Sequence, residues 1–174
     1  MNAQVFEQRG PSFVSKESKE IFLSSDDLIS LLKATLDKGS CCRFVVKGFS
    51  MHPFIKSKDV LTISPVGNKR LAIGDVVAFI SERPKQLIVH RIVKVTDDFY
   101  MVKGDNSLCS DGLIPKEDIL GYVVKQKRSG KDVCFGLGSE KYVIAFISFY
   151  THFFVVLSFF LKIIRFIVRK FKNA

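Results

Sequence analysis

The spacing of apolar residues changes along the chain, and each change predicts a different structural element. Residues 1–20 are polar and show no regular pattern. The next stretch, SSDDLISLLKATLDKG, has leucines at helical spacing, with serines and aspartates before them and Gly39 after them. Serine and aspartate satisfy the free amides at a helix start, and glycine favours a helix end. We therefore expect one short amphipathic helix at residues 26–37.

From residue 43 to about 127, short runs rich in Val, Ile and Phe alternate with turn residues. The runs are RFVVK, DVLTIS, DVVAFIS, QLIVHRIVKV, FYMVK and ILGYVVKQK, and PVGNK, SERPK and SDG lie among the turns between them. Short β-branched runs broken by Pro, Gly, Asn and Asp are typical of strands. The pattern predicts a mainly β fold, with a β-rich domain at 41–135 preceded by a polar segment at 1–40 that contains the helix.

The last part of the chain differs from both of these regions. Residues 142–160, YVIAFISFYTHFFVVLSFF, contain no Lys, Arg, Asp or Glu and approach the length that a bilayer core requires. The following LKIIRFIVRKFK is basic and amphipathic, and suits anionic headgroups. We expect a hinge at 136–140 and a C-terminal transmembrane and basic amphipathic helix within 139–174. A buried core helix is the alternative.

Composition supports a membrane as partner rather than nucleic acid. Hydrophobic residues make up 47% of the chain, yet its net charge is +10 and its pI about 9.5. Nucleic acid binding would explain the charge but not the apolar run.

The four cysteines form no C-x-x-C pair and have no histidine at metal-ligand spacing, so we expect free thiols, no metal and no cofactor. The first residues have no apolar core of a signal peptide, and the side of the membrane that the β domain faces stays open.

Four polar residues of the β domain are candidates for chemistry. Ser50, in KGFSMHPFIKSKDV, is either a nucleophile or a turn residue. His90 lies inside the apolar run LIVHRIV, where it needs a hydrogen-bonding partner and is either a base or a core histidine. Asp105 and Asp111 stand in GDN and SDG, which are also ordinary turn sequences. None of the four identifies a site by itself.

Their order and surroundings resemble the signal peptidase I family. The shared features are GFSMHPFI followed by KDV, IGDVV, VHRIV, KGDNS, SDG and DILGYV, which cover about residues 44–125. The resemblance is to the branch found in archaea, the eukaryotic secretory membrane and some bacteria, which has histidine where most bacterial members have lysine. It implies a small β domain of the signal peptidase and LexA type.

The resemblance also implies a serine endopeptidase that removes signal or leader peptides from precursor proteins after small residues. It assigns Ser50 as nucleophile, His90 as base and Asp111 as the carboxylate that orients the base, with Asp105 as a rival for that last role. A histidine base and a carboxylate are what a serine hydroxyl needs to attack a peptide carbonyl. Gly48 takes a position at which some relatives have a serine, so it offers no side-chain donor to the oxyanion.

Two other functions remain open. A LexA-like self-cleaving regulator shares this β fold, but it requires a lysine in place of His90 and a helix-turn-helix, for which a single helix is too little. A non-enzymatic membrane module that binds extended peptides by strand addition is the second. Family members usually begin with a membrane helix, whereas the apolar run of this chain follows the β domain.

Overall fold

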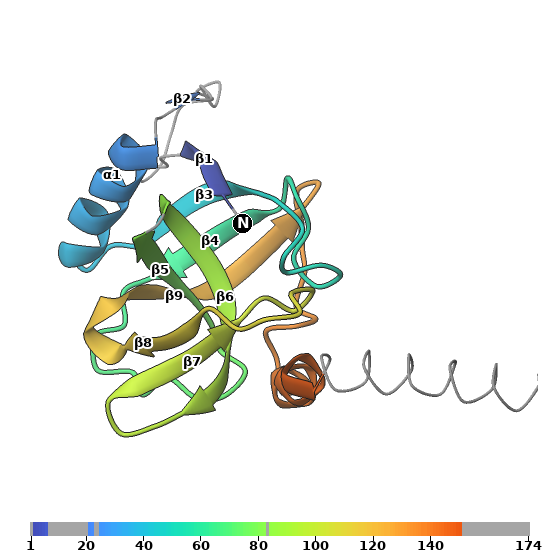
Figure 1. Cartoon of the computed structure of the whole chain (residues 1–174). Coiled ribbons are helices and arrows are strands. Elements are labelled where there is room, and N and C mark those ends of the chain that lie inside the picture. The colour runs from blue at the N-terminus through green and yellow to red at the C-terminus, as the bar shows by residue number, and fades with distance from the viewer. Residues whose placement is uncertain (1, 7–20, 23–24, 83, 151–174) are drawn as a thin grey trace, which may run out of the picture.

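A computed structural model describes residues 2–6, 21–22, 25–82 and 84–150, and its fold is mainly β, as the sequence predicts (Figure 1). Two helical elements have defined bounds, α1 (Ser25–Asp37) and the 3₁₀ helix η1 (Lys116–Asp118), and a further helix begins at residue 141 and continues to 150. The strands are β1 (Asn2–Phe6), β2 (Ile21–Phe22), β3 (Cys42–Lys47), β4 (Val60–Ser64), β5 (Val76–Glu82), β6 (Lys85–Val95), β7 (Phe99–Lys103), β8 (Gly112–Pro115), β9 (Ile119–Arg128) and β10 (Lys131–Asp132).

The strands form one antiparallel sheet in the order β2-β1-β3-β4-β9-β5-β6-β7-β8, with β10 paired to β9. Strand β6 is long enough to serve two partners: its first part pairs with β5, and its part from Arg91 onward also pairs with β7. Apolar side chains of β5 and β6 alternate between two cores, because successive strand residues point to opposite faces. Val76 and Val89 belong to one core, and Val77 and Ile88 to the other.

Helix α1 covers one of these cores, as the leucine spacing predicts (Figure 1). Leu28, Leu32 and Leu36 are buried against the sheet. Asp26 and Asp27 occupy the first turn, where carboxylates suit the positive end of the helix dipole. Gly39 ends the helix with φ of 74°, and its amide donates to the Leu36 carbonyl at 2.9 Å.

The structure adds strands that the sequence pattern does not predict. Residues 2–6 fall in the segment that reads as patternless, yet they form β1 against β3, with a register shift between Ala3 and Val5. Strand β8, Gly112–Pro115, follows the SDG turn and pairs with β7. Both are short, and the partner strand, rather than a local alternation of apolar and polar residues, gives each of them its extended form.

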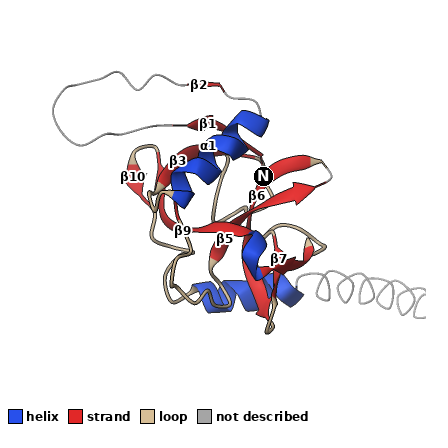
Figure 2. Ribbon diagram, turned by 90° about the vertical axis from the view of Figure 1, so that its left-hand side faces the viewer, coloured by secondary structure: helices blue, strands red, loops and turns tan. Residues whose placement is uncertain are grey.

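The helix that begins at residue 141 packs on the β domain (Figures 1 and 2). Ile144, Ala145 and Ser148 are buried, and the Lys141 ammonium lies 2.6 Å from the Asp75 carboxylate. The predicted membrane segment, residues 142–160, lies within the described part of the chain only as far as residue 150. Among the described residues, no helix is long and apolar enough to cross a bilayer.

The predicted hinge at residues 136–140 is a turn with internal hydrogen bonds. The Glu140 carboxylate accepts hydrogen bonds from the amides of Gly136 at 2.5 Å and Gly138 at 3.0 Å, and the Gly136 carbonyl accepts one from Arg91 at 2.8 Å. The bond from Arg91 connects the turn to the interior of the β domain.

Candidate active site

Ser50 lies on a turn directly after β3. Its loop begins at Gly48 and is held at its other end by hydrogen bonds to Asp59. Gly48 has φ of 108°, a conformation that side chains other than glycine rarely adopt, so the chain can leave β3 sharply. Met51 and Ile55 are buried in the core, and the Ile55 amide donates to the Met51 carbonyl at 3.0 Å. The serine is thus a turn residue held between a glycine and a buried methionine, with its side chain only partly covered.

The far end of this loop is held by Asp59, a residue that no pattern in the sequence marks as structural. Its buried carboxylate accepts hydrogen bonds from the Lys56 amide at 2.7 Å, from Gln126 at 2.8 Å and from two nitrogens of Arg128 at 2.8 Å. Gln126 and Arg128 each also donate to the Phe54 carbonyl at 2.9 Å. Burial raises the pKa of Asp59, but these hydrogen bonds outweigh it and hold the pKa below its usual value.

The structure brings three of the four candidate residues into one chain of hydrogen bonds. Nε2 of His90 lies 2.8 Å from Oγ of Ser50, and its Nδ1 lies 2.5 Å from Oδ2 of Asp111. An ionised carboxylate only accepts hydrogen bonds, so in the neutral ring Nδ1 carries the proton and Nε2 accepts from the serine hydroxyl. His90 is 5% exposed, whereas the Asp111 side chain is 24% exposed.

The KGDNS stretch after β7 passes against this group so closely that only glycine fits. A Cβ on Gly104 would lie 2.7 Å from the Ser50 carbonyl oxygen and 3.0 Å from Nε2 of His90. The Asn106 amide donates to the same Ser50 carbonyl at 2.7 Å. The backbone at Gly104 therefore forms one wall of the site and fixes the peptide plane that follows Ser50.

Asp105, the rival orienter of the base, is paired elsewhere. Its two carboxylate oxygens accept from Nε and Nη2 of Arg91 at 2.8 and 2.9 Å, and the Ser148 hydroxyl donates to it at 3.0 Å. The Arg91 and Asp105 side chains have no exposed surface. Nη1 of Arg91 donates to the carbonyls of Gly74 and Gly136, both at 2.8 Å. This network joins β6 to the C-terminal helix.

The buried arginine and lysine of this region were missed from the sequence. Lys103, the cross-strand partner of Arg91, is buried and its ammonium donates to the Ser148 carbonyl. Burial lowers the pKa of Lys103. One signal was available in the sequence: Arg91 and Lys103 both lie within apolar strand runs, RIV and FYMVK, where a charged residue needs a partner.

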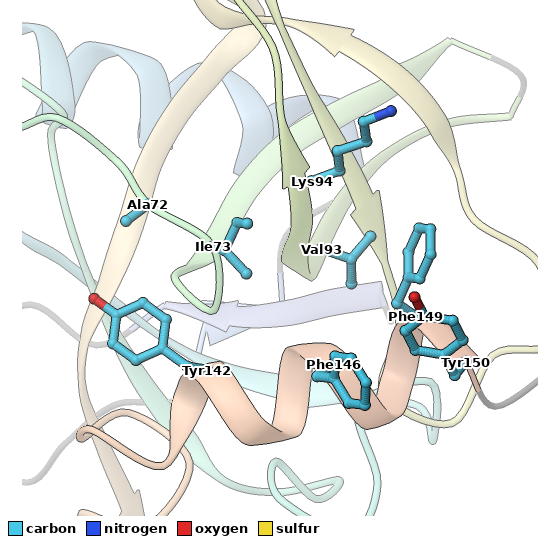
Figure 3. A pocket seen from close by; sticks show the side chains of 8 residues that line it. All are labelled: Ala72, Ile73, Val93, Lys94, Tyr142, Phe146, Phe149 and Tyr150. Carbon is cyan, nitrogen blue, oxygen red and sulfur yellow. The ribbon is translucent and has the colours of Figure 1, made fainter.

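A separate apolar cavity of about 640 Å³ lies where the C-terminal helix crosses the sheet (Figure 3). Figure 3 shows four aromatic rings of the helix along this cavity, with Ile73 and Val93 of the β domain on the other side. Phe146 is 61% exposed. The residues that line the cavity are Ala72, Ile73, Val93, Lys94, Tyr142, Phe146, Phe149 and Tyr150, and none of them belongs to the Ser50 site.

Comparison with known families gives a match for this chain. The model of the family described as Peptidase S24-like matches residues 12–124, which include Ser50, His90, Asp105 and Asp111. No curated protein gives a match. Since the match spans well over half of the sequence and contains the whole hydrogen-bonded group, the chain belongs to the Peptidase S24-like family.

Proposed function

We propose that this protein is a serine endopeptidase of the signal peptidase type, with Ser50 as nucleophile, His90 as base and Asp111 as the residue that orients the base. The observation that carries the proposal is the continuous chain from Oγ of Ser50 through the imidazole to the Asp111 carboxylate. In this geometry, His90 accepts the serine proton as Oγ attacks a peptide carbonyl, and Asp111 stabilises the imidazolium that forms. His90 then gives the proton to the leaving amine.

The transition state also needs donors for the developing oxyanion. Gly48 has no side chain to supply one, so the backbone N–H of Ser50 is the donor that we propose. The fixed turn favours this role, because Gly48, the buried Met51 and the Asn106 amide restrict how the peptide units around Ser50 can rotate. Donors that need no reorganisation during reaction stabilise the charge most effectively.

The substrate class follows from the resemblance to the histidine branch of signal peptidases. We propose that the enzyme removes signal or leader peptides from precursors after small residues. Its main rival, a self-cleaving regulator, requires a lysine base. The described lysine nearest to His90 in the sheet register is Lys103, and its ammonium is bonded to the Ser148 carbonyl rather than to Ser50.

We further propose that the protein is anchored in a membrane by the apolar segment at 142–160. The exposed aromatic rings of residues 142–150 support this, because Phe and Tyr side chains suit the boundary between headgroups and acyl chains. Washing membranes with alkaline carbonate tests the anchor. The full chain should stay in the pellet, and a chain that ends at residue 150, which keeps the packed part of the helix, should be released. Release of the full chain would overturn the anchor alone.

A serine-directed acylating probe tests the catalytic proposal without a known substrate. Wild-type protein should become labelled, and Ser50→Ala should not, whereas Ser107→Ala, a neighbouring serine, should label normally. Asp111→Asn and Asp105→Asn form a matched pair: the first should slow labelling, and the second should lower stability while the folded fraction still reacts. Equal labelling of wild type and Ser50→Ala would instead favour the peptide-binding module without catalysis.

A further inference from the structure

Two strands lead to the catalytic residues, and β1 lies against both. Strand β3 ends at Lys47, three residues before Ser50, and β1 pairs along its edge. Strand β6 contains His90, and β1 also contacts β6. On its edge toward β7, β6 is paired only from Arg91 onward. In the described part of the chain, no strand is hydrogen-bonded to this edge of β6 before Arg91. Strand β1 thus contacts both the strand that leads to Ser50 and the strand that contains His90.

The direction of β1 matters as much as its position. Residues of a substrate that precede a cut at Ser50 run toward Ser50, and along β3 they must therefore be parallel to it. Strand β1 is antiparallel: Asn2 pairs with Lys47 near Ser50, and Phe6 pairs with Phe44 farther away. It therefore covers the edge of β3 while running away from Ser50.

We propose that β1 is a resident competitor at the edge of β3, which a peptidase substrate that approaches Ser50 in extended form must displace. Extended peptides bind sheet edges through main-chain hydrogen bonds, and those on β3 are already satisfied by β1. The pairing with β3 joins four residues of β1 and is interrupted by a register shift between Ala3 and Val5, so a substrate that displaces β1 breaks only a short ladder. The inference rests on the proposed peptidase function, but it is tested by binding, which needs no cleavage.

The probe is a fluorescein-labelled extended peptide with alanines one and three positions before its cleavage site, titrated by anisotropy into Ser50→Ala protein so that nothing is cut. Deleting residues 2–6 should tighten binding by about tenfold, as expected if the edge is open only about a tenth of the time. Unlabelled NAQVF peptide should compete on the deleted protein. Val5→Pro, which removes a backbone donor, should act like the deletion, and Gln4→Ala, at the register shift, should not.

A second variant covers the case in which the deletion unfolds the protein. Ala3 and Val46 are direct partners, so Ala3→Cys with Val46→Cys can lock β1 on the edge when oxidised. The exposed thiols of Cys41, Cys109 and Cys134 are replaced by serine beforehand. The oxidised protein should bind no peptide and the reduced protein should bind it again. Equal binding in both states, unchanged affinity after the deletion, or Ser50-dependent cleavage within residues 2–6 would each overturn the proposal. Loss of probe labelling in wild type would instead overturn the peptidase function alone.

Discussion

Two adjacent residues of β6, His90 and Arg91, each pair with an aspartate, one in the proposed catalytic group and one in the interior of the fold. Each is a basic side chain that contacts an aspartate from the segment after β7, Asp111 for His90 and Asp105 for Arg91. Because neighbouring strand residues point to opposite faces, the two pairs lie on different sides of the sheet. The Arg91–Asp105 pair is fully buried and has two parallel hydrogen bonds, whereas Asp111 is partly open to solvent.

The difference in solvent access suits each basic side chain to a different role. A guanidinium never gives up its proton, so a sealed arginine pair can only hold parts of the fold together. An imidazole gains and loses a proton readily, and access to solvent and substrate makes that exchange useful. We therefore expect changes at His90 to affect rate and changes at Arg91 to affect stability.

Replacing His90 by Ala should have the largest effect. Without a base, Ser50 should react with the acylating probe about 10⁴-fold more slowly, which corresponds to about 5.5 kcal/mol of transition-state free energy. The free energy of unfolding in urea should fall by less than about 2 kcal/mol. His52→Ala, an exposed histidine two residues from Ser50, is the control and should react normally. A near wild-type rate for folded His90→Ala would show that His90 is structural.

Replacing Arg91 by Met should have the opposite effect to His90→Ala, with a large loss of stability and a small change in the reactivity of Ser50. The variant leaves the Asp105 carboxylate buried without its partner, and the carbonyls of Gly74 and Gly136 without a donor. Breaking such a pair costs about 3–5 kcal/mol, which urea unfolding measures directly. Adding Asp105→Leu to Arg91→Met should recover part of the loss, because the unpaired charge is then gone. A single-variant loss below about 1 kcal/mol would contradict a structural role for this pair.

Acidification should show that a second aspartate, Asp59 at the far end of the Ser50 loop, contributes to stability. The folded state lowers the pKa of Asp59, so its contribution to stability is present above the unfolded value of about 3.9 and is lost as pH falls through the lower folded value. Wild type should therefore lose unfolding free energy below about pH 4. Asp59→Asn should be less stable at pH 7 and should lose less on acidification. Parallel pH curves for the two proteins would contradict this account.

Replacing Lys103 by Met should have the smallest effect. The bond from its ammonium to the Ser148 carbonyl offsets the cost of burying the charge, so unfolding free energy should change by less than about 1 kcal/mol at pH 7. Because burial lowers the pKa of Lys103, wild type should gain stability relative to the variant as pH rises toward about 10. A loss as large as that of Arg91→Met would mean that Lys103 shares the structural role of Arg91.

The sequence predicted the elements that have strong local patterns. Helix α1 and the strands β3, β4, β5, β6, β7 and β9 match the apolar runs to within about a residue or two. One buried face gives α1, β3 and β4 a local period, and burial on both faces makes β5 and β6 nearly continuous apolar runs. It did not predict β1, whose form depends on β3, a strand far away in the chain. It also left Asp105 and Asp111 as rivals, because a turn sequence does not say which base its carboxylate reaches. The partners of Asp59 could not be predicted either, because Gln126 and Arg128 belong to β9, which is far from Asp59 in the sequence.

The alternation of His90 and Arg91 also makes the site sensitive to errors in folding. Val77 is opposite His90 and Val76 is opposite Arg91 in the pairing of β5 with β6. If β6 slipped by one residue, every side chain would change faces, so the guanidinium would move to the side of Ser50 and the imidazole would move into the interior. A misregistered molecule would then lack a base and also carry an unpaired buried aspartate. If Ser50 and His90 have the proposed roles, the reactivity of Ser50 reports correct registration of β6.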